Sequence, residues 1–170
     1  LVLGQYGPMM GTVIRSSHPG LIQASDGNLH VLIWTGTITV ENLDRSLAFA
    51  RSLAAQRPDG IIALNVVAHG LSLPDGVAQR RANEVSRLLD HVVTGTIVVL
   101  PGEGFWVVAA RSFITGLNMV SPLQGKRTIA RTVDEGSRTA AALSGRTPQW
   151  AGHVSSTVES WIADTRRDTH

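Results

Sequence analysis

Two short stretches of the sequence contain residues whose types and spacing could do chemistry. The first is "LPGEGFW", residues 100–106, in which Gly102 and Gly104 follow an apolar run. Glycines spaced in this way let backbone amides approach a phosphate. However, Val107 stands where a dinucleotide loop has its third glycine, Glu103 would repel phosphate, and no Gly-Lys-Ser/Thr follows. We therefore favour a tight turn that needs the positive φ of glycine, with an anion or small-ligand site as the alternative.

The second stretch is "HGLSLPD", in which His69, Ser72 and Asp75 are the residue types of a hydrolase triad. Residues this close along one loop rarely reach the geometry that a triad requires, and the Gly-x-Ser-x-Gly elbow is absent. Asp75 directly precedes a helical pattern, so we expect its carboxylate to cap that helix. We predict no catalytic residue, and an enzyme is the least favoured class of function.

Residues that could ligate a metal are sparse. The chain has no cysteine, and no two histidines have the His-x-x-x-His spacing. The histidines are His18, His30, His69, His91, His153 and His170. A metal site would need ligands that converge from distant parts of the chain, so we predict neither a metal nor a cofactor and interpret each histidine as structural or solvated. The lack of cysteine fits a reducing cytoplasm, which is the location we predict.

Composition restricts the partners. The chain has 170 residues, of which 43% are hydrophobic and 16% are charged, and its net charge is +2. This length suits one domain with a sizeable core. The charged share is below the usual quarter or so of a globular protein, which favours partly covered faces and self-association. No dense run of Lys and Arg interleaved with aromatic residues is present, so we predict no nucleic-acid partner.

The hydrophobic pattern alternates between strand and helix signals. Asp26-Gly27 separates two extended runs and indicates a hairpin. Apolar residues at helical spacing and continuous apolar runs predict the other elements. The expected strands are 20–25, 28–35, 61–68, 96–100 and 127–131, and the expected helices are 40–57, 75–92, 105–117, one starting in "TVDE" at Thr132, and 150–165.

This order predicts an α/β fold with a mixed, mainly parallel sheet of four to five strands, an N-terminal antiparallel hairpin and covering helices. We expect one domain over residues 20–165 and a flexible C-terminus at 166–170. Residues 1–19 are interpreted as an N-terminal arm or as residues foreign to the natural chain. No apolar run approaches the roughly 18–20 residues that cross a bilayer, and the first residues lack a signal-peptide pattern, so no membrane span is predicted.

The expected helix 105–117 has apolar residues around its whole circumference, including Phe105 and Trp106, and Arg111 is its only charge. A helix of this kind is usually buried on every side. We therefore expect either a homodimer contact or cover by the C-terminal helix. In both cases Arg111 would need a partner, for which Glu103 is a candidate, because an unpaired buried charge is costly.

The order of elements, their lengths and the positions of the loops over residues 20–143 resemble the STAS domain, the SpoIIAA-like fold of bacterial anti-sigma-factor antagonists and of sulfate-transporter tails. In the antagonists a phosphorylatable serine lies where the strand after the first helix meets the second helix, within Asp-Ser-Ser/Thr-Gly. Here the junction reads "NVVAHGLSLPDG", with Ser72 as its only hydroxyl and without that motif. The resemblance implies a non-catalytic domain that docks a protein partner.

Taken together, we predict a bacterial regulatory or scaffolding module that acts through protein–protein interaction and self-associates as a homodimer. The alternative is a domain that binds a small molecule or lipid with its loops 69–75 and 101–105, because ligands of open α/β sheets bind beyond the carboxyl ends of the strands. Both hypotheses share one set of candidate binding residues. These are His69, Ser72, Asp75, Gly102, Glu103, Gly104, Phe105, Trp106 and Arg111.

Overall fold

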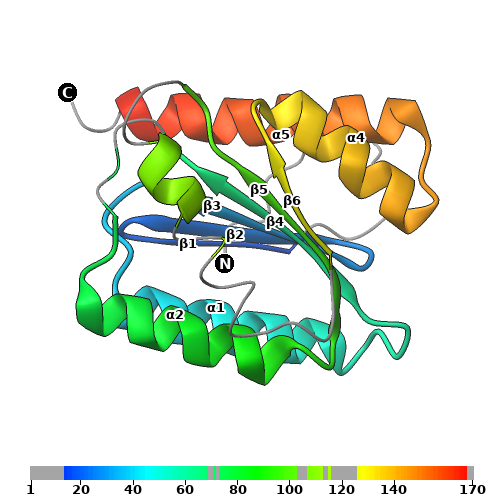
Figure 1. The fold of residues 1–170 in the computed structure, drawn as a ribbon. Helices are drawn as coiled ribbons and strands as arrows, with labels where there is room; N and C mark the ends of the chain where they lie inside the picture. The colour runs from blue at the N-terminus through cyan, green and yellow to red at the C-terminus, as the bar shows by residue number, and fades with distance from the viewer. Residues whose placement is uncertain are drawn as a thin grey trace.

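The structure is a computed structural model that describes residues 14–68, 71, 73–102, 107–112, 115 and 126–167. Its centre is a six-stranded sheet in which the spatial order of the strands follows the chain (Figure 1). The strands are β1 (Ile14–His18), β2 (Leu21–Asp26), β3 (Leu29–Trp34), β4 (Ile61–Val67), β5 (Val93–Val99) and β6 (Lys126–Ala130). β1, β2 and β3 pair antiparallel, whereas β3 to β6 run parallel. The predicted fold class is thereby confirmed.

The helices form a layer on each face of the sheet (Figure 1). They are α1 (Val40–Ala54), α2 (Gly76–Leu89), α4 (Val133–Ser144) and α5 (Pro148–Arg167), and residues 107–112 are also helical. α1 and α2 pack on one face, and α4 and α5 pack on the other. Among the described residues, no helix combines the length and the apolar character needed to span a membrane.

Side-chain caps fix where three of the helices begin. Thr39 accepts a hydrogen bond from the backbone N–H of Asn42, and Asp75 accepts from two N–H groups of the first turn of α2. At α4, Thr132 accepts from the Glu135 N–H, and the Glu135 carboxylate accepts from the backbone N–H before the cap. Such caps satisfy helix N–H groups that have no partner within the helix. The predicted cap at Asp75 is confirmed, and so is the predicted start of a helix at Thr132.

The sheet begins earlier than the sequence predicts. Residues 14–18, which were assigned to an N-terminal arm, form β1 and pair with β2 along its length. The Arg15 guanidinium lies 4.9 Å from the ring centroid of Trp161 on α5, so β1 also contacts the helical layer. The pattern "IRSSH" is short and polar, as is common for an edge strand. Because it contains no apolar run, it does not predict a strand from the sequence.

Within a single chain, the described part of the segment 105–117 is not buried on every side, so the expected cover by the C-terminal helix is wrong for this part, whereas the homodimer contact stays a prediction. Val107 and Ala110 are buried, but Val108 is 61% exposed and Arg111 is exposed as well. The segment is therefore one-sided, and α5 does not enclose it. Arg111 needs no buried partner because its charge faces solvent; Glu103, its predicted partner, lies outside the described residues.

The face under α4 and α5 is tightly filled. Gly136 lets α4 approach the sheet so closely that a Cβ at this position would lie 2.7 Å from Val99 Cγ2 and 3.2 Å from Leu64 Cδ1. Trp161 and Val158 of α5 complete the same cluster. The opposite face, under α1 and α2, is packed less completely and contains the candidate site.

Candidate ligand-binding pocket

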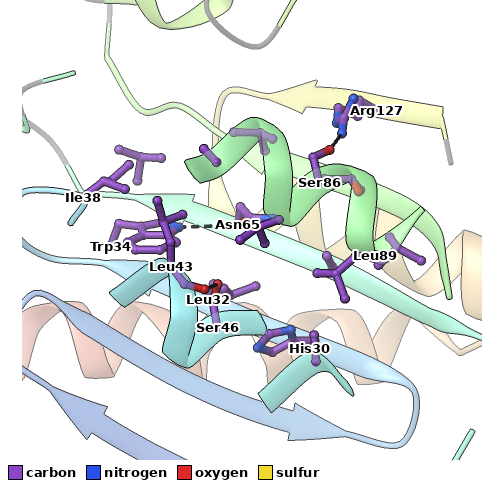
Figure 2. Close-up of a pocket in the computed structure, with 18 of the residues that line it drawn as sticks. His30, Leu32, Trp34, Ile38, Leu43, Ser46, Asn65, Ser86, Leu89 and Arg127 are labelled. Atoms are coloured by element: carbon purple, nitrogen blue, oxygen red, sulfur yellow. Dashed lines mark hydrogen bonds between the residues drawn. The ribbon is translucent and has the colours of Figure 1, made fainter. Parts of the chain in front are cut away.

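A pocket of about 210 Å³ lies between the sheet and the helices α1 and α2 (Figure 2). Its floor is made of side chains from four adjacent strands. Because the strands are in register, these side chains form rows across the sheet. The first row is His30, Ala63, Thr96 and Arg127. In the second row the residues that line the pocket are Leu32, Asn65 and Val98, and in the third row they are Trp34 and Val67.

The walls come from the inner stripes of the two helices. α1 contributes Leu43, Ser46 and Ala50, and α2 contributes Ala82, Val85, Ser86 and Leu89. These positions recur every three or four residues, which places them on one side of each helix. Each of α1, β4 and α2 also contributes an alanine to the lining, namely Ala50, Ala63 and Ala82. Because alanine fills little space between a helix and a sheet, this choice of residues leaves the volume open.

Asn65 places an amide in the middle of the floor. The Trp34 Nε1–H donates to Asn65 Oδ1 at 3.4 Å, and Figure 2 shows the two side chains pointing toward one another. An indole nitrogen can only donate a hydrogen bond, so the oxygen of the amide must face Trp34. The Asn65 Nδ2 group, with two donor hydrogens, is therefore on the other side.

His30 lies at one end of the first row and is only 2% exposed. Its Nε2 lies 3.3 Å from Gln23 Oε1, and its ring stacks on Phe49 with 4.8 Å between centroids. Burial lowers the pKa of His30 to about 3, because the imidazolium would lose its hydration. The ring is neutral at physiological pH, and its Nε2 is the donor to Gln23, since an amide oxygen can only accept.

Arg127, on the edge strand β6, supplies a charge at the other end of the row. Its guanidinium donates to the Ser86 hydroxyl of α2, as Figure 2 shows. Partial burial lowers the pKa of Arg127, and the negative charge of Asp90 acts in the opposite direction. His30 and Arg127 are three strand spacings apart, which is roughly 14 Å. The pocket thus has a neutral polar end, an apolar middle with one amide, and a charged end.

None of the three predicted binding residues that the structure describes lines this pocket. Asp75 is an exposed helix cap, Gly102 is exposed with φ of 100°, and Arg111 faces solvent. Gly102 has the positive φ that was predicted for it, and the residues that follow it in the predicted turn lie outside the described part of the chain. Six further candidates lie outside the described residues: His69, Ser72, Glu103, Gly104, Phe105 and Trp106.

Parts of the connections that follow β4 and β5 do reach the pocket. Leu73 and Pro74 precede α2, and Ala110 belongs to the helical segment after β5. All three are apolar. The predicted ligand loop 69–75 therefore contributes Leu73 and Pro74 to the site, although not through the residues singled out for it, whereas Ala110 lies outside the predicted loop 101–105.

The sequence contained one signal for the pocket that was not used. In the run "IIALNVVA" Asn65 is the only polar side chain, within a strand that is otherwise apolar on both faces. A polar group in the interior of such a strand is unusual and calls for a hydrogen-bonding partner. Ser86 and Arg127 gave no comparable signal, because their proximity depends on how α2 lies over β6.

Neither comparison of the sequence with known proteins identifies a relative: no family model matches the chain, and no curated protein matches it. The resemblance to the STAS domain therefore stays a prediction. Within the described ranges, no three His, Asp or Glu side chains are grouped so that they could hold a metal ion. What the geometry defines is an α/β domain with a mainly apolar pocket on one face of its sheet.

Proposed function

We propose that this protein is a binding module for a small, mainly apolar molecule held between the sheet and α2. The observation that carries this proposal is the pocket itself. Ligand sites are typically concave and apolar, with a few polar groups that orient the ligand. The pocket has this character, because alanine, valine and leucine side chains form most of its surface and Asn65, Ser86 and Arg127 are spaced along it.

The volume sets the size of the ligand. A cavity of about 150 Å³ accommodates benzene, so a pocket of about 210 Å³ corresponds to roughly eight or nine non-hydrogen atoms. This is the size of a substituted aromatic ring or a medium-length alkyl chain. This volume would hold part of one acyl chain rather than both chains of a bilayer lipid, so we narrow the lipid alternative to the burial of a single chain.

Filling the pocket from α2 tests the proposal. Ala82→Phe places a ring where the ligand would lie, whereas Val77→Phe adds the same ring to the same helix at a position that is 56% exposed. With acetophenone as the probe, we expect amide shifts of pocket residues in an NMR titration of the wild type and of Val77→Phe, and at least a tenfold weaker response in Ala82→Phe. Equal binding by all three proteins, or none by the wild type, would refute the pocket as a ligand site.

A second candidate is the protein-docking role predicted from the sequence, in particular with a second copy of this chain. Five large apolar side chains are exposed among the described residues. Four of them lie in the connection between a parallel strand and the next helix, or in the first turn of that helix: Val40, Leu73, Val77 and Val108. They therefore share the carboxyl edge of the sheet. Clustered exposed apolar residues favour an interaction surface. A regulatory role of the STAS kind would use this edge, and self-association is the property that tests it.

A further inference from the structure

We propose that the Asn65 amide selects ligands that carry a hydrogen-bond acceptor, and that the pocket therefore binds small aryl or alkyl carbonyl compounds rather than hydrocarbons. This inference rests on the proposed ligand-binding function and names the chemical class that the same site would take. It starts from the position of Asn65 in the floor of the pocket.

The strand conformation and the apolar neighbours both disfavour asparagine at this position, and only hydrogen bonds can favour it. β4 is a central strand of the sheet, and asparagine is depleted in strands. In its row Asn65 stands between Leu32 and Val98, both of which are buried and apolar. Placing an amide in apolar surroundings costs free energy unless its donors and acceptor are satisfied. Leucine or valine would pack this position at no such cost.

The contact with Trp34 satisfies only the oxygen of the amide. Because the indole N–H holds Asn65 Oδ1, the orientation of the amide is set before a ligand arrives. Within the described part of the chain, Asn65 Nδ2 makes no hydrogen bond, and the side chain lines the pocket. The site therefore presents donors, and the matching ligand group is an acceptor.

Two other polar side chains of the pocket, Ser46 and Arg127, already bond to protein groups. The Ser46 hydroxyl donates to the Leu43 carbonyl at 2.7 Å, and the Arg127 guanidinium donates to Ser86. Asn65 also lies in the second row, in the middle of the apolar floor, where the body of a ligand would rest. The acceptor should therefore be a neutral oxygen attached directly to the apolar body, as in a ketone or an aldehyde.

Two probes of matched shape test the selection. Acetophenone and α-methylstyrene differ only in the exchange of a carbonyl oxygen for a methylene group, so the ratio of their dissociation constants reports on the acceptor. We expect Asn65→Leu to reduce the preference for acetophenone about tenfold relative to the wild type, which is the usual size of one hydrogen bond. Comparing the ratio between proteins cancels the different solubilities of the probes. Asn83→Leu, the same exchange on α2 outside the pocket lining, should leave the ratio unchanged.

The outcomes separate this inference from the proposed function. If neither probe binds the wild type, both fail. If both probes bind and the ratio is the same in Asn65→Leu, the pocket stands and the selection by Asn65 is wrong. Should Asn65→Leu not fold, Asn65→Asp decides when it is measured at alkaline pH, because its ionised carboxylate still accepts from Trp34 but offers no donor. The preference for acetophenone should be lost in that variant too, and its retention would overturn the inference.

Discussion

At the scale of single residues, the pocket combines polar groups that are held in fixed states. His30 is neutral because its burial disfavours the charged form, and its hydrogen bond to Gln23 fixes which ring nitrogen carries the proton. Trp34 in turn fixes the orientation of the Asn65 amide. Side chains with one defined state form a preorganised site, so little free energy would be spent on ordering them when a ligand binds.

The buried His30 predicts a specific dependence of stability on pH. In the unfolded chain histidine takes up a proton below about pH 6.5, whereas in the folded protein the pKa of His30 is about 3. Between these values the unfolded state binds more protons, so stability is lost as the pH falls. From pH 7 to pH 5 the His30 contribution should lower the free energy of unfolding by about 2 kcal/mol.

Urea unfolding at both pH values measures this loss, and His30→Gln separates it from the titration of the carboxylates. Glutamine keeps a donor for Gln23 but does not titrate, so the variant should lose about 2 kcal/mol less than the wild type between pH 7 and pH 5. An identical loss in the two proteins would contradict the assignment of His30 as a buried neutral ring.

At the scale of elements, the two glycines inside the C-terminal helices have opposite roles. Gly136 faces the sheet at a distance that leaves no room for a Cβ, whereas a Cβ at Gly152 of α5 would meet nothing within 4 Å. Glycine lowers helix stability by about 1 kcal/mol relative to alanine. At position 136 glycine is required for the close packing of α4 on the sheet, and this packing offsets the loss of helix stability.

Alanine at the two sites should have effects of opposite sign. Gly136→Ala gains helix propensity but pushes α4 off Val99 and Leu64, and such overpacking costs about 1–3 kcal/mol, so we expect a net loss of stability. Gly152→Ala gains the propensity alone and should raise the free energy of unfolding by up to about 1 kcal/mol. Chemical unfolding of both variants checks this, and a stabilising Gly136→Ala would show that α4 can move without loss.

Several of the helices and strands could be predicted from the sequence. Periodic apolar residues and caps were sufficient for α1, β4, α2 and α5, because each of these elements carries its pattern within a single segment. β1 was missed because its residues are mostly polar and its place depends on pairing with β2. The segment around Val108 and Arg111 was misread because its apolar composition gave no information about which residues the sheet covers.

The pocket could not be predicted because it belongs to no single element. Its first row joins residues that are up to 97 positions apart, from His30 to Arg127, and only the register of three strand pairs aligns them. The open volume also depends on alanines that line the pocket from three different elements, α1, β4 and α2. Of all these features, only Asn65 stands out in the sequence, as a polar residue within an apolar strand.

At the scale of the whole molecule, the exposed apolar side chains are distributed unevenly. Val77 and Val108 lie near the carboxyl edge of the sheet, whereas Leu143 lies at the far end of α4, 49% exposed. If this edge joins two copies of the chain, Val77→Asp and Val108→Asp should each shift a dimer toward monomer in sedimentation velocity at tens of micromolar. Leu143→Asp should not, and a wild type that stays monomeric at all concentrations would exclude the dimer.

The agreement between strand order and chain order bears on how the chain acquires its structure. Every neighbour in the sheet is also the next strand along the polypeptide. Pairs with small sequence separation require less loop-closure entropy and form faster than distant ones. We therefore expect a growing chain on the ribosome to add strands one at a time to one edge of the sheet, so that the site between α2 and β6 is completed only after β6 has been synthesised.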